Sequence, residues 1–197
     1  MFEWIVGVVS SAGYIGVAAL MALENLFPPI PSELIMPVAG FAAARGDLTI
    51  TGVILAGTAG SVIGTLPWYW LGRRLGRRRI RHLAERHGRW LTISPDEVDR
   101  AHGWFERHGG KAVFFGRLIP AIRTLISVPA GIAAMPMGRY LVWSTLGSLI
   151  WTSLLALAGY VLESQYDLVA AYMDPVSKGV IALMVLTYLY RVVRRKG

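Results

Sequence analysis

A proline-rich stretch, Phe27-Pro28-Pro29-Ile30-Pro31-Ser32-Glu33, decides the fold of this chain. Three prolines within four positions remove backbone N–H donors and fix φ, so no continuous helix can pass from Pro28 to Pro31. The flanking sequence is long and apolar, as in a membrane protein. Broken backbone at membrane depth is tolerated only where protein or a water-filled cavity surrounds it, and a carboxylate there is a candidate functional group. Glu33 is such a carboxylate.

The composition indicates an integral membrane protein. The 197 residues are 54% hydrophobic and the mean hydropathy is +0.49, values that exclude an ordinary soluble domain. There is no cysteine, which excludes disulfides and thiolate chemistry. The start, Met1-Phe2-Glu3-Trp4, has an acid and no Lys or Arg before the first apolar run, which argues against a removed signal peptide. We expect one membrane domain over residues 1–197.

The positive charge is concentrated in two places. The formal net charge is +8, eight arginines lie between Arg73 and Arg89, and four more cations lie between Arg191 and Lys196. Both clusters flank apolar runs, and the positive-inside rule places such clusters in the cytoplasm. The charge therefore predicts topology, and we expect no nucleic acid as a partner. Anionic lipid headgroups are expected to bind the same basic segment.

The apolar runs predict four spanning helices, at residues 5–23, 48–71, 140–162 and 180–190. In the second run, Ala56, Gly60 and Gly64 recur every four residues and form a small-residue face suited to close helix packing.

The segments between these runs fall into two kinds. Residues 24–47 and 111–137 are apolar but broken by prolines, which predicts two re-entrant hairpins that each enter and leave on one side. Residues 72–110 are polar and form a basic cytoplasmic insert, expected as two short helices. Within it, Ser94-Pro95-Asp96-Glu97 reads as a helix N-cap followed by proline and acids in the first turn.

The alternation of these segments predicts an inverted repeat. With both basic clusters in the cytoplasm, the first hairpin opens to the outside and the second to the cytoplasm. Two halves of opposite orientation are typical of secondary transporters, whose broken elements meet near the midplane. The predicted fold is therefore an all-α membrane protein with four spanning helices and two re-entrant hairpins.

Charged residues within the hairpins form the candidate site: Glu24, Glu33 and Asp47 in the first, Arg117 and Arg123 in the second. A charge at the bilayer centre costs a few kcal/mol, so each needs a partner or water. The arginine fork suits phosphate, and a buried carboxylate can hold a proton. We expect the arginines to bind a phosphate-headed lipid and the acids to bind protons or pair with the arginines.

A structural role is the alternative for each charge. Glu24 and Asp47 lie near predicted segment ends, where helix capping or contact with headgroups explains them equally well. Glu33 and Arg123 are expected deeper, close to Pro31 and Pro120, and there a buried ion pair without transport function is the competing explanation.

Metal and hydrolase chemistry find little support. His82-Leu83-Ala84-Glu85-Arg86-His87 approaches an inverted zinc-protease motif, but Arg86 moves His87 out of the required spacing. His102 and His108 lie in the polar insert, where we expect them to be solvated. The chain has no nucleophile elbow and no phosphate-cradling glycine loop. We expect no metal, no cofactor and no enzymatic activity.

Two motifs resemble the DedA family of bacterial membrane proteins, which share the VTT or SNARE-associated domain. The first is Glu24-Asn25-Leu26-Phe27-Pro28-Pro29-Ile30-Pro31-Ser32-Glu33. The second is Gly116-Arg117-Leu118-Ile119-Pro120-Ala121-Ile122-Arg123, which continues to Pro129-Ala130-Gly131. Tyr69-Trp70-Leu71-Gly72-Arg73 also fits. Family members often carry an acid near the position of Thr65, and its absence here shifts the expected proton role to Glu33 and Asp47.

The resemblance implies a multi-pass transporter of the bacterial cytoplasmic (inner) membrane. Undecaprenyl phosphate recycling is associated with some members and phospholipid translocation with others. The resemblance also implies dependence on the proton gradient and an essential role for two acids and two arginines. From the residues alone, a proton-coupled small-ion or solute transporter and a non-transporting scaffold remain alternatives, and a homo-oligomer is compatible with the sequence.

Overall fold

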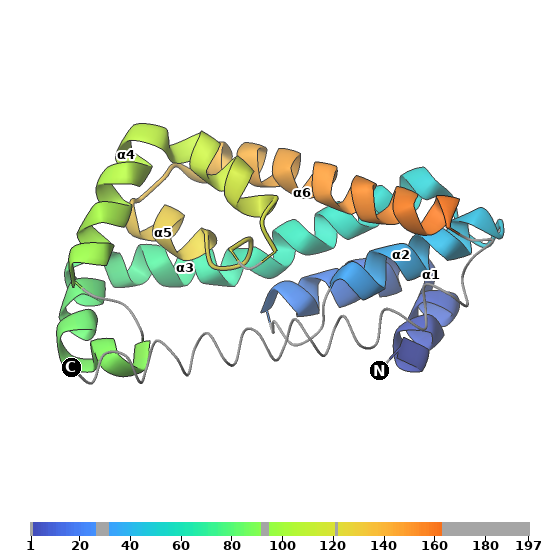
Figure 1. Ribbon diagram of the computed structural model, residues 1–197, viewed down its shortest axis with the longest axis horizontal. Coiled ribbons are helices and arrows are strands. Elements are labelled where there is room, and N and C mark those ends of the chain that lie inside the picture. The colour runs from blue at the N-terminus through green and yellow to red at the C-terminus, as the bar shows by residue number, and fades with distance from the viewer. Residues whose placement is uncertain (1, 27–31, 92–94, 121, 163–197) are drawn as a thin grey trace.

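The computed structural model describes residues 2–26, 32–91, 95–120 and 122–162. These residues form helices and turns and contain no strand, so the all-α prediction is confirmed for this part of the chain. In chain order the helices are α1 (Phe2–Leu26), α2 (Ser32–Ala44), α3 (Ile50–Leu91), α4 (Pro95–Arg117), α5 (Ser127–Ile132) and α6 (Met137–Val161) (Figure 1).

Three of these helices are long and apolar enough to cross a membrane: Glu3–Leu26, Ile50–Gly76 and Met137–Val161. They coincide with three of the four predicted spans. Their outward surfaces carry exposed large apolar side chains, including Ile15 on α1 and Leu55 on α3, as expected for helices that face lipid. The fourth predicted span, at 180–190, lies outside the described residues.

The basic insert agrees with the expectation of two short helices. α3 is 42 residues long, but Gly76 within it has φ 62°, a left-handed conformation outside the helical region. Residues 77–91 contain no proline and are rich in Arg, which is a good helix former. The helical residues after Gly76 and those from Pro95 to the bend at Gly109 are the two short segments of the insert. α4 begins at Pro95 with Asp96 and Glu97 in its first turn, as the sequence predicts.

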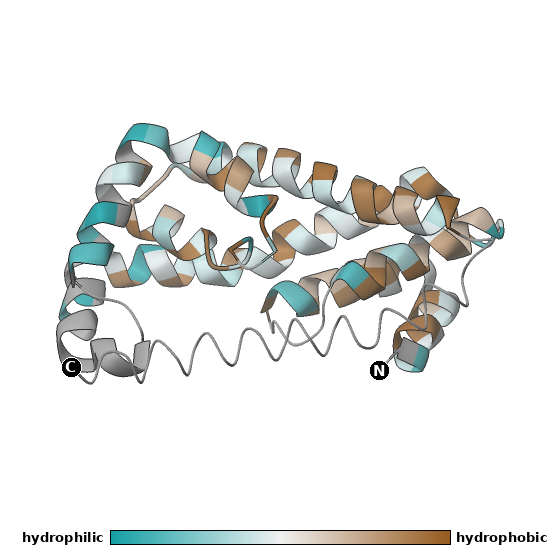
Figure 2. Cartoon of the chain, in the orientation of Figure 1, coloured by the Kyte–Doolittle hydropathy of each residue, from teal (hydrophilic) through white to brown (hydrophobic). Residues whose placement is uncertain are grey.

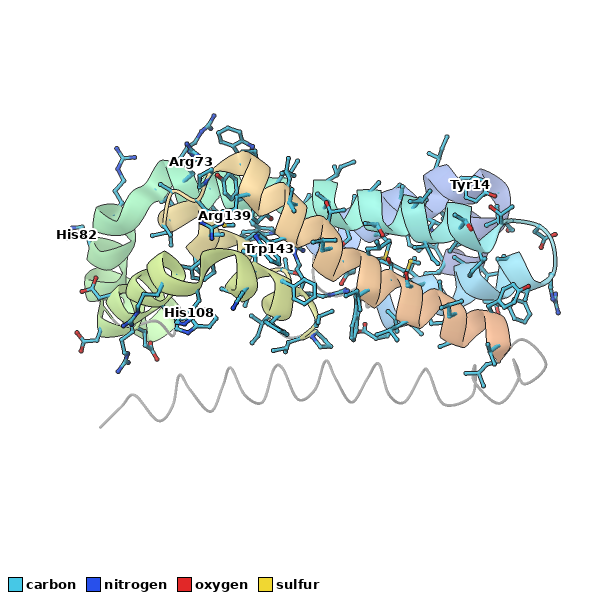
Figure 3. The ribbon with its side chains drawn as sticks, turned by 90° about the horizontal axis from the view of Figure 1, so that it is seen from above. Tyr14, Arg73, His82, His108, Arg139 and Trp143 are labelled. Carbon is cyan, nitrogen blue, oxygen red and sulfur yellow. The ribbon has the colours of Figure 1, made fainter. Side chains whose placement is uncertain are left out.

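The polar residues gather at one end of the molecule. Figure 2 shows the hydrophilic colour concentrated at the end of the molecule that holds α4, while the hydrophobic colour lies mainly on α1, α2 and α6. Arg73, His82, His108 and Arg139 lie in this half, and Tyr14 lies in the other (Figure 3).

Both proline-containing segments interrupt the helices. α1 ends at Leu26 and α2 begins at Ser32, on either side of the proline stretch, whose residues 27–31 lie outside the described ones. α4 ends at Arg117, and turns at 118–120 and 122–126 lie between it and the six-residue α5. The helix before each break is itself bent at a glycine, α1 at Gly13 (φ 55°, ψ −132°) and α4 at Gly109 (φ 4°, ψ −80°).

The two short helices pack in corresponding ways. α2 packs against α6, and α5 packs against α3 (Figure 1). In each pair the two backbones approach closely at glycines, where any larger side chain would not fit. In the α2–α6 pair, a Cβ at Gly40 or Gly159 would collide with the backbone of the facing helix. In the α3–α5 pair, a Cβ at Gly72 or Gly131 would do the same. Each short helix is therefore held against a long helix of the other half of the chain.

The predicted small-residue face of α3 is also in contact. A Cβ at Gly60 would meet the Ala18 carbonyl of α1, and one at Gly64 would meet the Ala22 carbonyl. Close approach of this kind stabilises membrane helices through dispersion forces, because lipid offers no hydrophobic driving force for helix association. α1 and α3 consequently form a tight pair that fixes the end of α1, where Glu24 lies.

Candidate functional site

Glu24 and Arg123 form a buried ion pair. Glu24 lies in the last turn of α1, and Arg123 lies in the turns that follow α4. Arg123 donates a hydrogen bond from Nη2 to Glu24 Oε1, and the two side chains are only 4% and 6% exposed. The pair therefore joins the two proline-broken segments inside the protein.

Asn25 holds the other oxygen of the Glu24 carboxylate. Its Nδ2 lies 2.7 Å from Glu24 Oε2, 2.9 Å from the Met21 carbonyl and 3.3 Å from the Ser61 hydroxyl. The backbone carbonyl of Asn25 accepts a hydrogen bond from Trp68 Nε1 at 3.0 Å. Since Asn25 is fully buried, these contacts fix the carboxylate orientation and link it to α3.

Trp151 of α6 connects the ion pair to the start of α2. The Arg123 guanidinium carbon lies 5.9 Å from the centre of the Trp151 ring, at the outer limit of a cation–π contact. Trp151 Nε1 donates to the Ser32 hydroxyl at 3.3 Å, and that hydroxyl lies 3.5 Å from Glu33 Oε2. Glu33, the first acid of α2, is thus an indirect neighbour of Arg123.

Arg117 lies in a second cluster made of hydroxyl groups. It is 1% exposed, and its Nη2 donates to Thr65 Oγ1 at 2.5 Å and to the Tyr140 hydroxyl at 3.1 Å. The Tyr140 oxygen also lies 3.0 Å from Thr65 Oγ1 and 2.9 Å from Ser127 Oγ. One hydroxyl proton can serve only one of these two acceptors. Residues of four segments, α3, α4, α5 and α6, therefore form this cluster.

The charge of Arg117 has no carboxylate hydrogen-bonded to it in the described part of the chain, and its Nε and Nη1 have no hydrogen-bond partner there. Burial of a guanidinium is costly, and buried donors are nearly always paired in native proteins. The arrangement therefore suits an anion that would bring its own oxygens to these donors.

Asp47 is not one of the residues that form the two buried clusters. It is exposed in the turn between α2 and α3, where it lines a cavity of about 490 Å³ together with Val6, Val9, Phe41 and Arg45. The structure therefore brings together Glu24 and Arg123, connects Glu33 to them, and leaves Asp47 outside.

The prediction that Glu33 lies deeper in the protein than Glu24 is wrong. Glu33 is half-buried, whereas Glu24 is 5% exposed. The reason is that α1 continues as a helix to Leu26, so Glu24 projects from a packed helix into the bundle and is not at a frayed segment end. Which of these residues act in function stays a prediction.

Several neighbours of the charges were not singled out from the sequence, namely Asn25, Ser61, Ser127, Tyr140 and Trp151. Thr65 was noticed only as a departure from the family pattern, and the structure places it against Arg117. Polar residues recur every four positions along α6, and this pattern could have indicated from the sequence that Tyr140 lies on the polar face of that helix.

The zinc-protease-like motif lies in the polar part of α3. His82 is exposed there, and the side chains from 83 to 87 lie outside the described ones. His108 is exposed on α4, with Nδ1 3.3 Å from the Trp104 carbonyl. Neither histidine contributes to the two buried clusters.

Comparison with known proteins decides the family. The VTT domain model matches residues 30–161 of the chain. This chain belongs to the VTT-domain, or DedA, family. No solved structure matches the VTT-domain chain.

Relatives of this VTT-domain protein cover nearly its whole length. An "Alkaline phosphatase-like protein" of Lactococcus lactis subsp. cremoris is 41% identical over 96% of this chain and 89% of its own. "Undecaprenyl phosphate transporter A" of Bacillus subtilis is 32% identical over 95% and 91%, and the Staphylococcus aureus protein of that name is 31% identical over 96% and 93%. With its three apolar helices, the chain is a multi-pass protein of the bacterial inner membrane.

Proposed function

We propose that this protein moves a phosphate-headed lipid between the leaflets of the cytoplasmic membrane, with undecaprenyl phosphate as the first candidate and a phospholipid as the second. The observation that carries the proposal is Arg117, a buried guanidinium held by hydroxyls in a bundle of apolar helices, with two nitrogens that have no hydrogen-bond partner among the described residues. The names of two relatives support the choice of lipid.

Arg117 would bind the phosphate. Arginine presents several N–H donors in a rigid plane that matches phosphate oxygens. Its Nη2 contacts with Thr65 and Tyr140 orient the guanidinium, which leaves Nε and Nη1 as donors for the ligand. The polyprenyl or acyl chain would stay in the bilayer, so that only the head group requires a polar path.

Arg123 and Glu24 would form the proton-sensitive part of the site. While Glu24 is ionised, it holds Arg123 in the buried pair. Protonation of Glu24 would remove the counter-charge and release Arg123 for the phosphate, and departure of the phosphate would let the pair form again. Competition between a carboxylate and a lipid phosphate for one arginine provides a direct means of coupling transport to protons. Glu33, linked through Ser32 and Trp151, is the second candidate proton carrier.

We further propose that the two halves form an inverted repeat. The corresponding bends in α1 and α4 and the crossed packing of α2 on α6 and α5 on α3 support this arrangement. At 13 residues, α2 is about 20 Å long, too short to cross a hydrocarbon core of about 30 Å. It would therefore be one arm of a re-entrant hairpin, as would α5, with the basic end of the molecule in the cytoplasm.

A leaflet-exchange assay tests the proposal. Vesicles containing undecaprenyl phosphate are reconstituted with the protein and exposed to an external phosphatase that cannot enter. Wild-type protein is expected to make the inner-leaflet pool available to the phosphatase, and Arg117→Ala to abolish this. Arg139→Ala is the matched control, because Arg139 is exposed on α6. If folded wild-type protein leaves the inner pool protected from hydrolysis, with or without a pH gradient, transport of this lipid is refuted.

A further inference from the structure

Hydroxyl groups line the contact between α3 and α6 at successive turns. All of them are buried: Thr58, Ser61 and Thr65 on α3, and Tyr140, Ser144, Ser148 and Thr152 on α6. On α6 they recur every four residues, so they share one face of the helix. We call these seven residues the hydroxyl ladder.

Three levels of the hydroxyl ladder are paired across the helices. Thr58 and Thr152 lie 2.9 Å apart, Ser61 and Ser148 3.4 Å apart, and Thr65 and Tyr140 3.0 Å apart, measured between their hydroxyl oxygens. The pairs run in opposite sequence directions, as antiparallel helices require. A continuous polar stripe therefore crosses the interior of the apolar bundle.

The two arginine clusters attach to successive levels of this ladder. Arg117 bonds directly to Thr65, and Arg123 connects to Ser61 through Glu24 and Asn25. Four residues along an α-helix correspond to about 6 Å of rise. The two guanidiniums are thus anchored at levels of α3 one helical turn apart.

Ser144 is the one member of the hydroxyl ladder without a hydrogen-bond partner in the described structure. It is fully buried, one turn from Tyr140 on one side and from Ser148 on the other. Among the described residues, the other buried side-chain atoms without a partner belong to the two arginine clusters: Asn25 Oδ1, Arg117 Nε and Nη1, and Arg123 Nη1. Buried polar groups without partners are rare in native proteins and call for an explanation.

The threonines of the hydroxyl ladder can exchange their partners. Thr58 also contacts the Ile54 carbonyl of its own helix at 2.7 Å, and Thr152 contacts the Ser148 carbonyl at 2.9 Å. If α3 and α6 move apart, these two threonines keep an acceptor within their own helices, so their protons do not become unsatisfied. The oxygen lone pairs and the serine protons are then available to a ligand.

We infer that Ser144, with Ser61 and Ser148, forms an intermediate phosphate-binding position between Arg117 and Arg123, and that the hydroxyl ladder is the path of the lipid head group. This inference rests on the proposed transport function and adds to it a binding position made of neutral groups. Hydroxyls hold a phosphate less tightly than a guanidinium does, which suits a site that the head group must both enter and leave.

The test compares Ser144→Ala with Ser153→Ala in the undecaprenyl phosphate vesicle assay. Ser153 lies on the same helix about two and a half turns later, hence on the opposite face. We expect Ser144→Ala to slow transfer by about tenfold or more, as loss of one hydrogen bond to a charged group predicts. Its thermal stability in detergent should be unchanged or raised, because an unpartnered buried hydroxyl is removed.

Two outcomes of this comparison are distinguishable. If wild-type protein transfers the lipid and Ser144→Ala transfers it as fast as Ser153→Ala, the intermediate position is refuted and the proposed function stands. If wild-type protein itself transfers no undecaprenyl phosphate, the proposed function fails, and the inference fails with it.

Thiol labelling gives a second readout that does not depend on the transport rate. Because the chain has no cysteine, S144C carries a single thiol. We expect a membrane-impermeant anionic methanethiosulfonate to label S144C in vesicles, and undecaprenyl phosphate to slow this labelling, with S153C showing no such protection. Equal labelling of S144C with and without the lipid, at concentrations that support transfer, would overturn the inference.

Discussion

Arg123 donates a hydrogen bond to Glu24 from a segment 99 residues further along the chain, and both side chains are buried. This pair is the direct link between the two charged motifs. Its position inside apolar helices means that each charge depends on the other, since removal of one partner leaves the other charge buried and uncompensated.

Glu24→Gln is therefore expected to destabilise the protein by about 3–5 kcal/mol, the usual cost of breaking a buried pair. Thermal unfolding in detergent measures this. The double variant Glu24→Gln/Arg123→Gln should recover part of the loss, because it removes the unpaired charge as well. Equal melting temperatures for wild type and Glu24→Gln would show that the pair does not form in the folded protein.

Arg117→Lys keeps the positive charge but replaces the planar guanidinium by a point charge that cannot reproduce its set of donors. We expect undecaprenyl phosphate transfer to fall by about tenfold or more, the equivalent of at least one hydrogen bond to a charged group. The vesicle assay measures it. Arg139→Lys makes the same change at an exposed position of α6 and should retain the wild-type rate. Full activity of Arg117→Lys would reduce the role of Arg117 to its charge alone.

Tyr140→Phe removes the hydroxyl that contacts Arg117, Thr65 and Ser127 but keeps the ring, which stacks on Tyr69 at a centroid distance of 4.5 Å. Because buried partners lose a hydrogen bond, we expect a loss of about 1–3 kcal/mol of stability and weaker binding of the lipid phosphate. Denaturation and lipid-binding titration in detergent report the two effects. Tyr160→Phe at an exposed site of α6 is the control, and a Tyr140→Phe protein as stable as that control contradicts the expectation.

Asp47→Asn should leave both stability and transport close to wild type. The side chain is exposed in the turn between α2 and α3, and substitutions at such positions usually change stability by no more than about 0.5 kcal/mol. Glu24→Gln and Asp47→Asn are compared in vesicles with and without a pH gradient. Loss of the gradient response in Asp47→Asn alone would return Asp47 to the position of proton carrier.

Gly131→Ala tests the close contact of α5 with α3. A Cβ there would collide with the Tyr69 carbonyl, a backbone atom that cannot move aside independently, so we expect a loss of about 1–3 kcal/mol, as for overpacking in a core. Gly138→Ala is the matched control: a Cβ at Gly138 meets nothing within 4 Å, and alanine in a helix is favoured over glycine. A Gly131→Ala protein as stable as the Gly138→Ala protein would mean that α5 does not pack on α3 in this way.

Much of the architecture could be predicted from the sequence because the bilayer imposes strict rules on composition. Uncharged runs near twenty residues long become helices, which located α1, the first part of α3 and α6. Prolines interrupt helices locally, which placed the break between Leu26 and Ser32. The end of the apolar part of α3 was predicted to within a few residues: the apolar run ends at Leu71, and the helix is broken at Gly76 (φ 62°), where glycine tolerates a positive φ.

The sequence by itself determined that charged residues of opposite sign occur in two proline-broken motifs, because charges in apolar surroundings require partners or water. Only the tertiary structure decided which charges meet. Pairing of Arg123 with Glu24 depends on the packing of α1 on α3 and on the position of Arg123 near Trp151 of α6, contacts between segments far apart in the chain. The surroundings of Arg117 have the same origin, since its hydroxyl partners come from α3 and α6 and no spacing rule within one helix relates them.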